Sequence, residues 1–275
     1  MNRTGRVIAA AVKNLFIAVI SLVILVPVFM IFINSFKDKR QSSSMGMELP
    51  EVWHFENFLT VIEKGKLVQS FLNSIGYSVF AVVISVLLAA LAAFVLSRNR
   101  TKFNRFLYYV MIMGIAMPIN FVALMKVMQF LQIINTRTGL VLLYAAIQIP
   151  FSVFLIYAFV GSLPVELDEA SILDGCNSLQ LFGLVILPLL KPVIITVFIL
   201  NFLNTWNEFV LPLYFMNDSR SWPITLSVYS FFGRYSSDWH LVCADIVLIC
   251  IPVVAVYLLG QRYIISGMTA GAVKG

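Results

Sequence analysis

Long runs of apolar residues dominate this chain, and each run is long enough to form a helix that crosses a membrane. A helix rises 1.5 Å per residue, so hydrocarbon about 30 Å thick needs roughly 20 apolar residues. Runs of this kind cover residues 12–34, 71–96, 106–132, 139–160, 192–213 and 241–264. The pattern predicts an all-α integral membrane protein with about six transmembrane helices, built as a single transmembrane domain over residues 1–275.

The composition excludes most classes of soluble protein. Of the 275 residues, 60% are hydrophobic and only 12% are charged, whereas soluble domains average about 25% charged residues. Spans that fill the chain leave no room for a large folded domain in water, so we do not expect catalysis by a separate folded domain. The cysteines lack paired spacing, the two histidines lie far apart and no phosphate-binding loop occurs. Neither a metal nor a nucleotide is therefore expected on this chain.

Basic residues outside the apolar runs predict the orientation in the membrane. Those near the N-terminus or in the short connection after the second run are Arg3, Arg6, Lys13, Arg98, Arg100, Lys102 and Arg105. Short loops rich in Lys and Arg stay in the cytoplasm. Both segments are expected there, and an even number of spans then places both termini in the cytoplasm. We attribute the net charge of +6 to such loops, and it does not indicate that the chain binds nucleic acid.

The connection 161–191, between the fourth and fifth runs, is the most informative segment. Pro164, followed closely by three acidic residues, is typical of a helix N-terminus, where proline fits the first turn and negative charge suits the helix dipole. Gly175 is expected to end this helix, because glycine tolerates a left-handed backbone. An acidic helix on an otherwise basic surface indicates a protein partner. A purely structural hairpin at the membrane interface would have the same composition.

The same connection carries a long motif. It reads Glu169-Ala170-Ser171, three further residues, Gly175, nine further residues and then Val185-Ile186-Leu187-Pro188. This motif resembles the EAA loop of the membrane subunits of ATP-binding-cassette (ABC) importers, with Ser171 in place of the third small residue and Val185 in place of isoleucine. The resemblance implies the type I ABC importer permease fold, with a cytoplasmic coupling helix that docks into a cleft of an ATPase subunit.

The resemblance also assigns roles within the loop. Glu169 would make polar contacts in the ATPase cleft, while Ala170 and Ser171 would allow close approach and Gly175 would permit the turn. The expected coupling residues are Glu169, Ala170, Ser171, Asp174, Gly175, Leu187 and Pro188. ATP and magnesium would be bound by the ATPase subunits, and no cofactor by this chain.

Two further stretches resemble the carbohydrate-uptake branch of these importers, in particular the smaller membrane subunit of the maltose-type importers. They are residues 206–213, with Trp206-Asn207-Glu208-Phe209 and Pro212-Leu213, and the ending 267–275. The resemblance implies a multi-pass subunit of a prokaryotic cell membrane that assembles with a second permease subunit, two copies of a cytoplasmic ATPase and an external sugar-binding protein. It also implies that Lys274 and Gly275 contact the ATPases, although a glycine-rich end is equally typical of a disordered tail.

A polar stripe lies within the fifth apolar run. Asn201, Asn204 and Glu208 are spaced three and four residues apart, so they share one helical face. Amides and carboxylates pair with sugar hydroxyls, which makes the stripe a candidate wall of the translocation pathway. Hydrogen bonds between helices would explain it equally well, and in the maltose-type relatives most sugar contacts come from the other membrane subunit.

Other polar and proline positions inside the runs predict local features. Irregular helix geometry is expected at Pro118 with Asn120 and at Gln148 with Pro150. Asp245 is expected to pair with a donor on a neighbouring helix, because an isolated carboxylate is costly in the membrane.

Other functions stay open on the sequence. An ABC permease for a polyol or a glycerol phosphate ester would share these motifs, since the sequence does not name the sugar. A stand-alone secondary transporter would show ion-coupling acids at mid-membrane and inverted repeats, and neither is clear here. An intramembrane enzyme would need a polar catalytic pair at membrane depth, and Asp245 has no visible companion.

Overall fold

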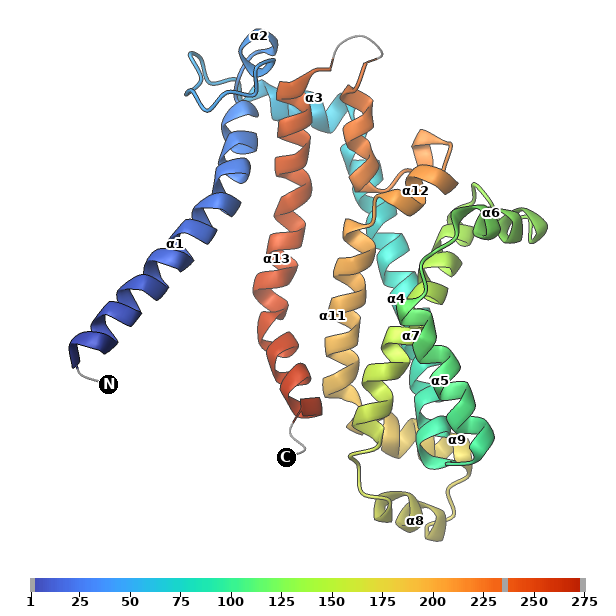
Figure 1. Ribbon diagram of the computed structural model, residues 1–275. Helices are drawn as coiled ribbons and strands as arrows, with labels where there is room; N and C mark the ends of the chain where they lie inside the picture. The colour runs from blue at the N-terminus through green and yellow to red at the C-terminus, as the bar shows by residue number, and fades with distance from the viewer. Residues whose placement is uncertain (1–2, 234–236, 273–275) are drawn as a thin grey trace. The chain divides into compact units, whose positions relative to one another are not determined.

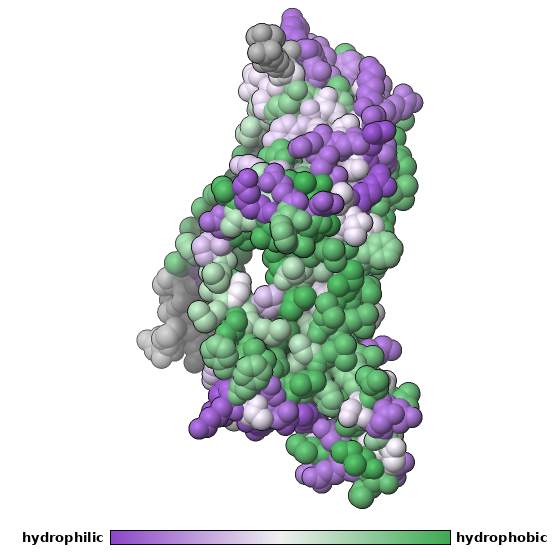
Figure 2. Space-filling view, turned by 90° about the vertical axis from the view of Figure 1, so that its right-hand side faces the viewer, coloured by the Kyte–Doolittle hydropathy of each residue, from purple (hydrophilic) through white to green (hydrophobic). Residues whose placement is uncertain are grey.

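The computed structural model describes residues 3–233 and 237–272, and these residues form helices joined by loops. No β-strand occurs in the described ranges, apart from one isolated bridge between Phe232 and Ser237. The all-α prediction is therefore confirmed. On the face drawn in Figure 2, hydrophobic residues form broad patches and hydrophilic residues gather apart from them, as expected for helices that contact lipid.

The helices follow one another in this order. They are α1 (Arg3–Asn34), α2 (Lys39–Ser42), α3 (Glu56–Lys64), α4 (Leu67–Arg98), α5 (Lys102–Ala116), α6 (Phe121–Phe130), α7 (Arg137–Val160), α8 (Glu166–Leu173), α9 (Ser178–Gln180), the π-helix η1 (Leu181–Ile186), α10 (Leu187–Leu189), α11 (Lys191–Asn207), α12 (Val210–Phe215), the 3₁₀ turns η2 (Ser219–Ser221) and η3 (Ile224–Phe231), and α13 (Trp239–Ala272).

Four of the described helices are long and apolar enough to cross a membrane unaided. The crossing segments are Val12–Asn34, Leu67–Arg98, Arg137–Val160 and Trp239–Gln261. Two helix pairs qualify only together, α5 with α6 across a bend of 116° and Ser178–Leu189 with Lys191–Asn207 across a bend of 74°. Counting each bent pair as one span gives six.

The bend between α5 and α6 follows from local sequence. Met117 is extended, with ψ 124°, because the ring of Pro118 disfavours helical geometry in the residue before it. Asn120 then caps α6, since its side chain accepts a hydrogen bond from the Ala123 N–H at 3.0 Å. Pro150, by contrast, lies inside α7 without ending it.

By its internal contacts the chain divides into two compact units, and the boundary within α13 falls at Pro252. The first unit comprises Met1–Val68 and Ser227–Ile251, and the second comprises Gln69–Leu226 and Pro252–Gly275.

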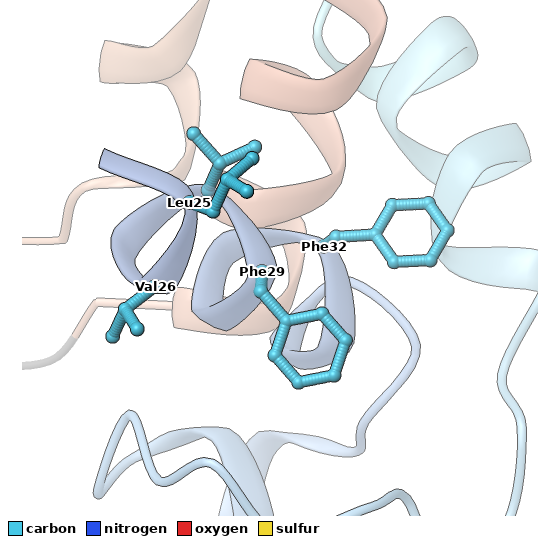
Figure 3. Close-up of a pocket in the computed structure, with 5 residues that line it drawn as sticks. Leu25, Val26, Phe29 and Phe32 are labelled. Atoms are coloured by element: carbon cyan, nitrogen blue, oxygen red, sulfur yellow. The ribbon is translucent and has the colours of Figure 1, made fainter. Parts of the chain in front are cut away.

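In the first unit, α1 presents apolar side chains to its surroundings. A shallow hollow of about 430 Å³ beside this helix is lined by Leu25, Val26, Val28, Phe29 and Phe32, and the side chains labelled in Figure 3 project from α1. The hollow has no polar side chain, so it offers no hydrogen bond to a ligand. Its composition is that of a surface that faces lipid or another apolar helix.

In the second unit, α4, α5, α7 and α11 form a bundle (Figure 1). Its buried centre combines small residues of α4, such as Ala89 and Ala93, with Val153 and Ile156 of α7 and Val197 of α11. Small residues let helix backbones approach closely in a membrane. Helix α8 lies at one end of this bundle, and α6 and α12 lie at the other (Figure 1).

Candidate functional site

Helix α8 is a separate short helix at one end of the bundle of the second unit (Figure 1). Its first turn contains Glu166, Asp168 and Glu169, whose negative charges suit the positive end of the helix dipole. The helix begins two residues later than Pro164 and ends two residues before Gly175. The sequence therefore folds here as an isolated acidic helix, within one to two residues of the expected limits.

Gly175 closes α8 in a left-handed conformation with φ +86°. The Gly175 N–H donates to the Ile172 carbonyl at 3.0 Å, and the Cys176 N–H donates to the Ser171 carbonyl at 3.0 Å. This is the Schellman arrangement, which satisfies the last carbonyls of a helix. A Cβ atom at Gly175 would meet no atom within 4 Å, so glycine is required by the backbone angle and not by space.

The coupling residues predicted from the sequence lie on different sides of this loop. Glu169, Ala170, Asp174 and Gly175 are exposed, while Ser171 is buried and its hydroxyl donates to the Leu167 carbonyl at 2.7 Å. Further along, Leu187 is half-buried and Pro188 is exposed. The structure thus brings the acidic and small residues together on α8, and it places Leu187 and Pro188 after η1.

Large apolar side chains also stand exposed on this segment. Leu173 is 88% exposed, and Ile172 and Leu179 are exposed as well. Such residues next to exposed carboxylates are typical of a surface that a protein partner covers. The charge pattern of the sequence indicated the acidic residues but not these apolar ones.

An ion pair from α4 holds α8 in place. Arg98 Nη2 donates to Asp168 Oδ1 at 3.2 Å, and Nε lies 2.7 Å from Oδ2 in an ion-pair contact in which its N–H does not point at the oxygen. The side chains are only 14% and 11% exposed. Arg98 Nη1 also donates to the Leu163 carbonyl at 3.2 Å, in the turn before α8. From the sequence, Arg98 was expected only to set the orientation of the chain in the membrane.

The polar stripe of α11 splits into buried and exposed members. Asn201 is buried, and its Nδ2 donates to Ser152 Oγ of α7 at 2.8 Å. Gln148 of α7 donates to the Thr205 hydroxyl and to the Asn201 carbonyl, and it accepts from Ser85 Oγ of α4 at 3.1 Å. The hydrogen-bonding interpretation therefore holds for Asn201.

Asn204 and Glu208 line a cavity beside this network. The cavity has a volume of about 270 Å³ and is lined by Tyr144, Ile147, Gln148, Phe151, Asn201, Asn204, Thr205, Glu208 and Leu211. Tyr144 Oη and Asn201 Oδ1 are buried without a hydrogen-bond partner among the described residues. The cavity thus combines aromatic surface with hydrogen-bonding groups and a half-buried carboxylate, the chemistry that suits a hydroxyl-rich ligand.

Glu208 has a structural task as well. Its Oε1 accepts hydrogen bonds from the N–H groups of Val210 at 2.8 Å and Leu211 at 3.0 Å, which cap the start of α12. The backbone of Glu208 is extended, with ψ 124°, so α11 ends at Asn207. The expected range 192–213 is therefore divided between α11 and α12.

The remaining predicted positions lie elsewhere. Asp245, in the first unit, is fully buried, and its Oδ2 accepts a hydrogen bond from Ser227 Oγ at 2.8 Å. Lys274 and Gly275 lie outside the described residues. Among the residues that the structure describes, no group of three or more His, Cys, Asp or Glu could hold a metal ion.

Comparisons with known proteins place these features in a family. The family model described as "Binding-protein-dependent transport system inner membrane component" matches residues 85–270. A diacetylchitobiose uptake system permease protein of Streptomyces coelicolor is 34% identical, over 96% of this chain and 89% of its own length. A probable starch degradation products transport system permease protein of Thermoanaerobacterium thermosulfurigenes is 32% identical, over 93% and 94%.

Two further matches cover almost the entire chain. The melibiose/raffinose/stachyose import permease protein of Bacillus subtilis is 29% identical, over 99% of this chain and 100% of its own length. The fold matches a chain of a bacterial ABC transporter involved in the import of the acidic polysaccharide alginate, with a TM-score of 0.82, 24% identity and coverage of 96% and 98%. The chain belongs to the family of binding-protein-dependent transport system inner membrane components, the permease subunits of ABC importers, in which a separate subunit hydrolyses ATP.

Proposed function

We propose that this chain forms one half of the translocation pathway of an importer for neutral di- or oligosaccharides. The relatives support a sugar, because they are named for diacetylchitobiose, starch degradation products and melibiose, raffinose or stachyose.

The cavity beside α11 supports a neutral cargo over a phosphate ester. Its lining contains two amides of asparagine, one of glutamine, a tyrosine hydroxyl and the carboxylate of Glu208, and it contains no lysine or arginine. The carboxylate of Glu208 would repel a phosphate there. An anion held away from water requires a cationic partner, and this lining has none. Hydroxyl groups pair well with amides and with a carboxylate. We therefore assign Asn201, Asn204 and Glu208 to the pathway wall, with Asn201 acting mainly through its helix contacts.

We further propose that α8 is the coupling helix through which the ATPases act. The single observation that carries this assignment is the exposed surface of α8, where Glu169 and Ala170 stand beside Leu173 at one end of the bundle. A rigid, capped helix that an ATPase displaces moves as one body, and it therefore transmits the displacement. The assembly would contain a second permease subunit, two copies of a cytoplasmic ATPase carrying ATP and magnesium, and an external sugar-binding protein.

The basic loop after α4 supports a cytoplasmic location for α8 and for both termini. Arg98, Arg100, Lys102 and Arg105 fall in or beside this loop, and Arg98 contacts α8 directly. Lys274 and Gly275 would then meet the ATPases from the same side.

Co-purification from solubilised membranes tests the proposal. The tagged full chain should bring down an ATPase and a second permease subunit, and proteoliposomes of the complex should take up a neutral oligosaccharide when ATP and the binding protein are present. A thermal shift of the binding protein against a panel of di- and oligosaccharides, polyols and glycerol phosphate identifies the cargo, since a ligand that binds only the folded form raises its melting point. A complex that lacks an ATPase, or a binding protein that responds only to the phosphate ester, contradicts the proposal.

A further inference from the structure

Helix α8 packs against η1, and two short connections join it to the rest of the bundle. Before it, the chain leaves α7 through the turn 161–165, and after it the chain passes Gly175 and the Asn177 cap into α9 and η1. Both connections contain residues outside long helices, and such residues deform more easily than a helix does. The contact with η1 leads on to α11, so a displacement of α8 reaches α4 directly only through a further link between α8 and that helix.

Arg98 supplies a direct link between α8 and α4. It is the last residue of α4, and its guanidinium reaches both the carboxylate of Asp168 and the Leu163 carbonyl. One side chain thus fixes α8 and the turn before α8 to the same helix end. The contact distances of 2.7 Å and 3.2 Å to Asp168, with both side chains mostly buried, distinguish this pair from exposed surface pairs, which contribute little.

We infer that Arg98 is a positioning residue that transmits movement of α8 to α4, and that Asp168 is its partner on the coupling helix. This inference rests on the proposed function, because it presumes that an ATPase moves α8. The planar guanidinium is needed to hold the carboxylate and the carbonyl together, and the single ammonium group of lysine does not offer this geometry. The neighbouring Arg100 donates to the Ser97 carbonyl at 3.3 Å and, within the described part of the chain, forms no hydrogen bond or ion pair with the loop of α8, so it serves as a matched control.

The test is a nucleotide-dependent accessibility measurement on the intact complex. A cysteine replaces Ile147, an exposed residue of the cavity lining, in a background in which Cys176, Cys243 and Cys250 are serine. Labelling by a membrane-impermeant maleimide is compared with and without ATP plus vanadate. We expect nucleotide to change the labelling rate in the parent complex and in Arg100→Gln.

In Arg98→Gln and Asp168→Asn we expect ATP hydrolysis to persist while the change in labelling falls by at least about fivefold, the low end of typical coupling between sites. Arg98→Lys should restore little of it, and the exchanged pair Arg98→Asp with Asp168→Arg should restore part of it. A full nucleotide response in Arg98→Gln overturns the inference, as does a loss in the Arg98 variants that is matched by Arg100→Gln. If the parent complex contains no ATPase or shows no response to nucleotide, the proposed function itself has failed. The two failures are therefore distinguishable.

Discussion

Asn201 of α11 donates a hydrogen bond to Ser152 of α7 at 2.8 Å, and both residues are buried. Gln148, one turn before Ser152, also bonds to α11 and reaches Ser85 on α4. These bonds join the helices that carry the cavity wall to the helix that ends at Arg98. The cavity and α8 are therefore parts of one packed structure within the second unit.

Replacement of Asn201 with alanine should weaken the packing of α11 on α7. Hydrogen bonds between helices in a membrane contribute about 0.6 kcal/mol on average and at most about 1.7 kcal/mol. A double-mutant cycle with Ser152→Ala, measured by reversible unfolding in mixed micelles, should give a coupling energy in that range. As a control, Asn207→Ala should change the free energy of unfolding by less than about 0.5 kcal/mol, because among the described residues the hydrogen bond of this exposed amide goes to the Leu203 carbonyl of its own helix. Independent effects of the Asn201 and Ser152 variants would contradict this account of the pair.

Replacement of Gly175 with alanine should strain the end of α8. A left-handed backbone costs a residue with a Cβ atom about 1–2 kcal/mol, and the φ of +86° demands that conformation. Limited proteolysis between α8 and α9 should become faster, with transport per ATP reduced. Gly183→Ala is the matched control, since a Cβ there also meets nothing within 4 Å, and Gly183 has no positive φ. Equal behaviour of the two alanine variants would show that the backbone angle at Gly175 is unimportant.

Two substitutions of Glu208 should separate its structural role from its role in transport. Glu208→Gln keeps an oxygen that can cap α12, so the complex should assemble normally. The loss of one charge-assisted hydrogen bond, about 1.5 kcal/mol, should raise the KM for uptake of the sugar by about tenfold. Glu208→Ala should also lose the cap, at about 1 kcal/mol of folding stability. An unchanged KM for uptake by Glu208→Gln would contradict the assignment of this carboxylate to the pathway wall.

The loop before α3 should open locally in acid. His54 Nδ1 lies 2.5 Å from Glu56 Oε1, and this hydrogen bond lowers the pKa of the Glu56 carboxyl below its ordinary value of 4.5. A depressed pKa in the folded state means that the contact stabilises the loop above pH 4.5 and that this stabilisation is lost as the pH falls through the folded pKa. The protection of the amides of residues 54–57, measured relative to the intrinsic exchange rate at each pH, should therefore decrease in that window. In Glu56→Gln the protection of the same amides should change little with pH there, and a matching loss of protection in that variant would contradict the assignment.

The parts of this structure that depend on neighbouring residues were predictable from the sequence. The ranges 12–34, 71–96, 139–160 and 241–264 lie within α1, α4, α7 and α13, because length and hydropathy alone define a spanning helix. The break at Pro118 likewise follows from the restriction that proline places on the residue before it.

Features that depend on distant residues were not predictable. Arg98 and Asp168 are 70 positions apart, and nothing in either segment indicates that they meet. The same holds for Gln148 and Thr205, whose bond depends on how α7 packs against α11. Irregular helix geometry was predicted at Pro118, but the bend of 116° between α5 and α6 was not. Tertiary packing determines all three.

The most direct test of the central claim is photo-cross-linking from α8. A photoreactive amino acid in place of Leu173, which is 88% exposed, should cross-link the chain to its ATPase in the assembled complex, and the product should bind nucleotide. The same amino acid in place of Phe130, 87% exposed on α6 at the opposite end of the second unit, should give no such product. Cross-linking to the ATPase from position 130 and not from position 173 would contradict the claim that α8 is the helix on which the ATPase acts.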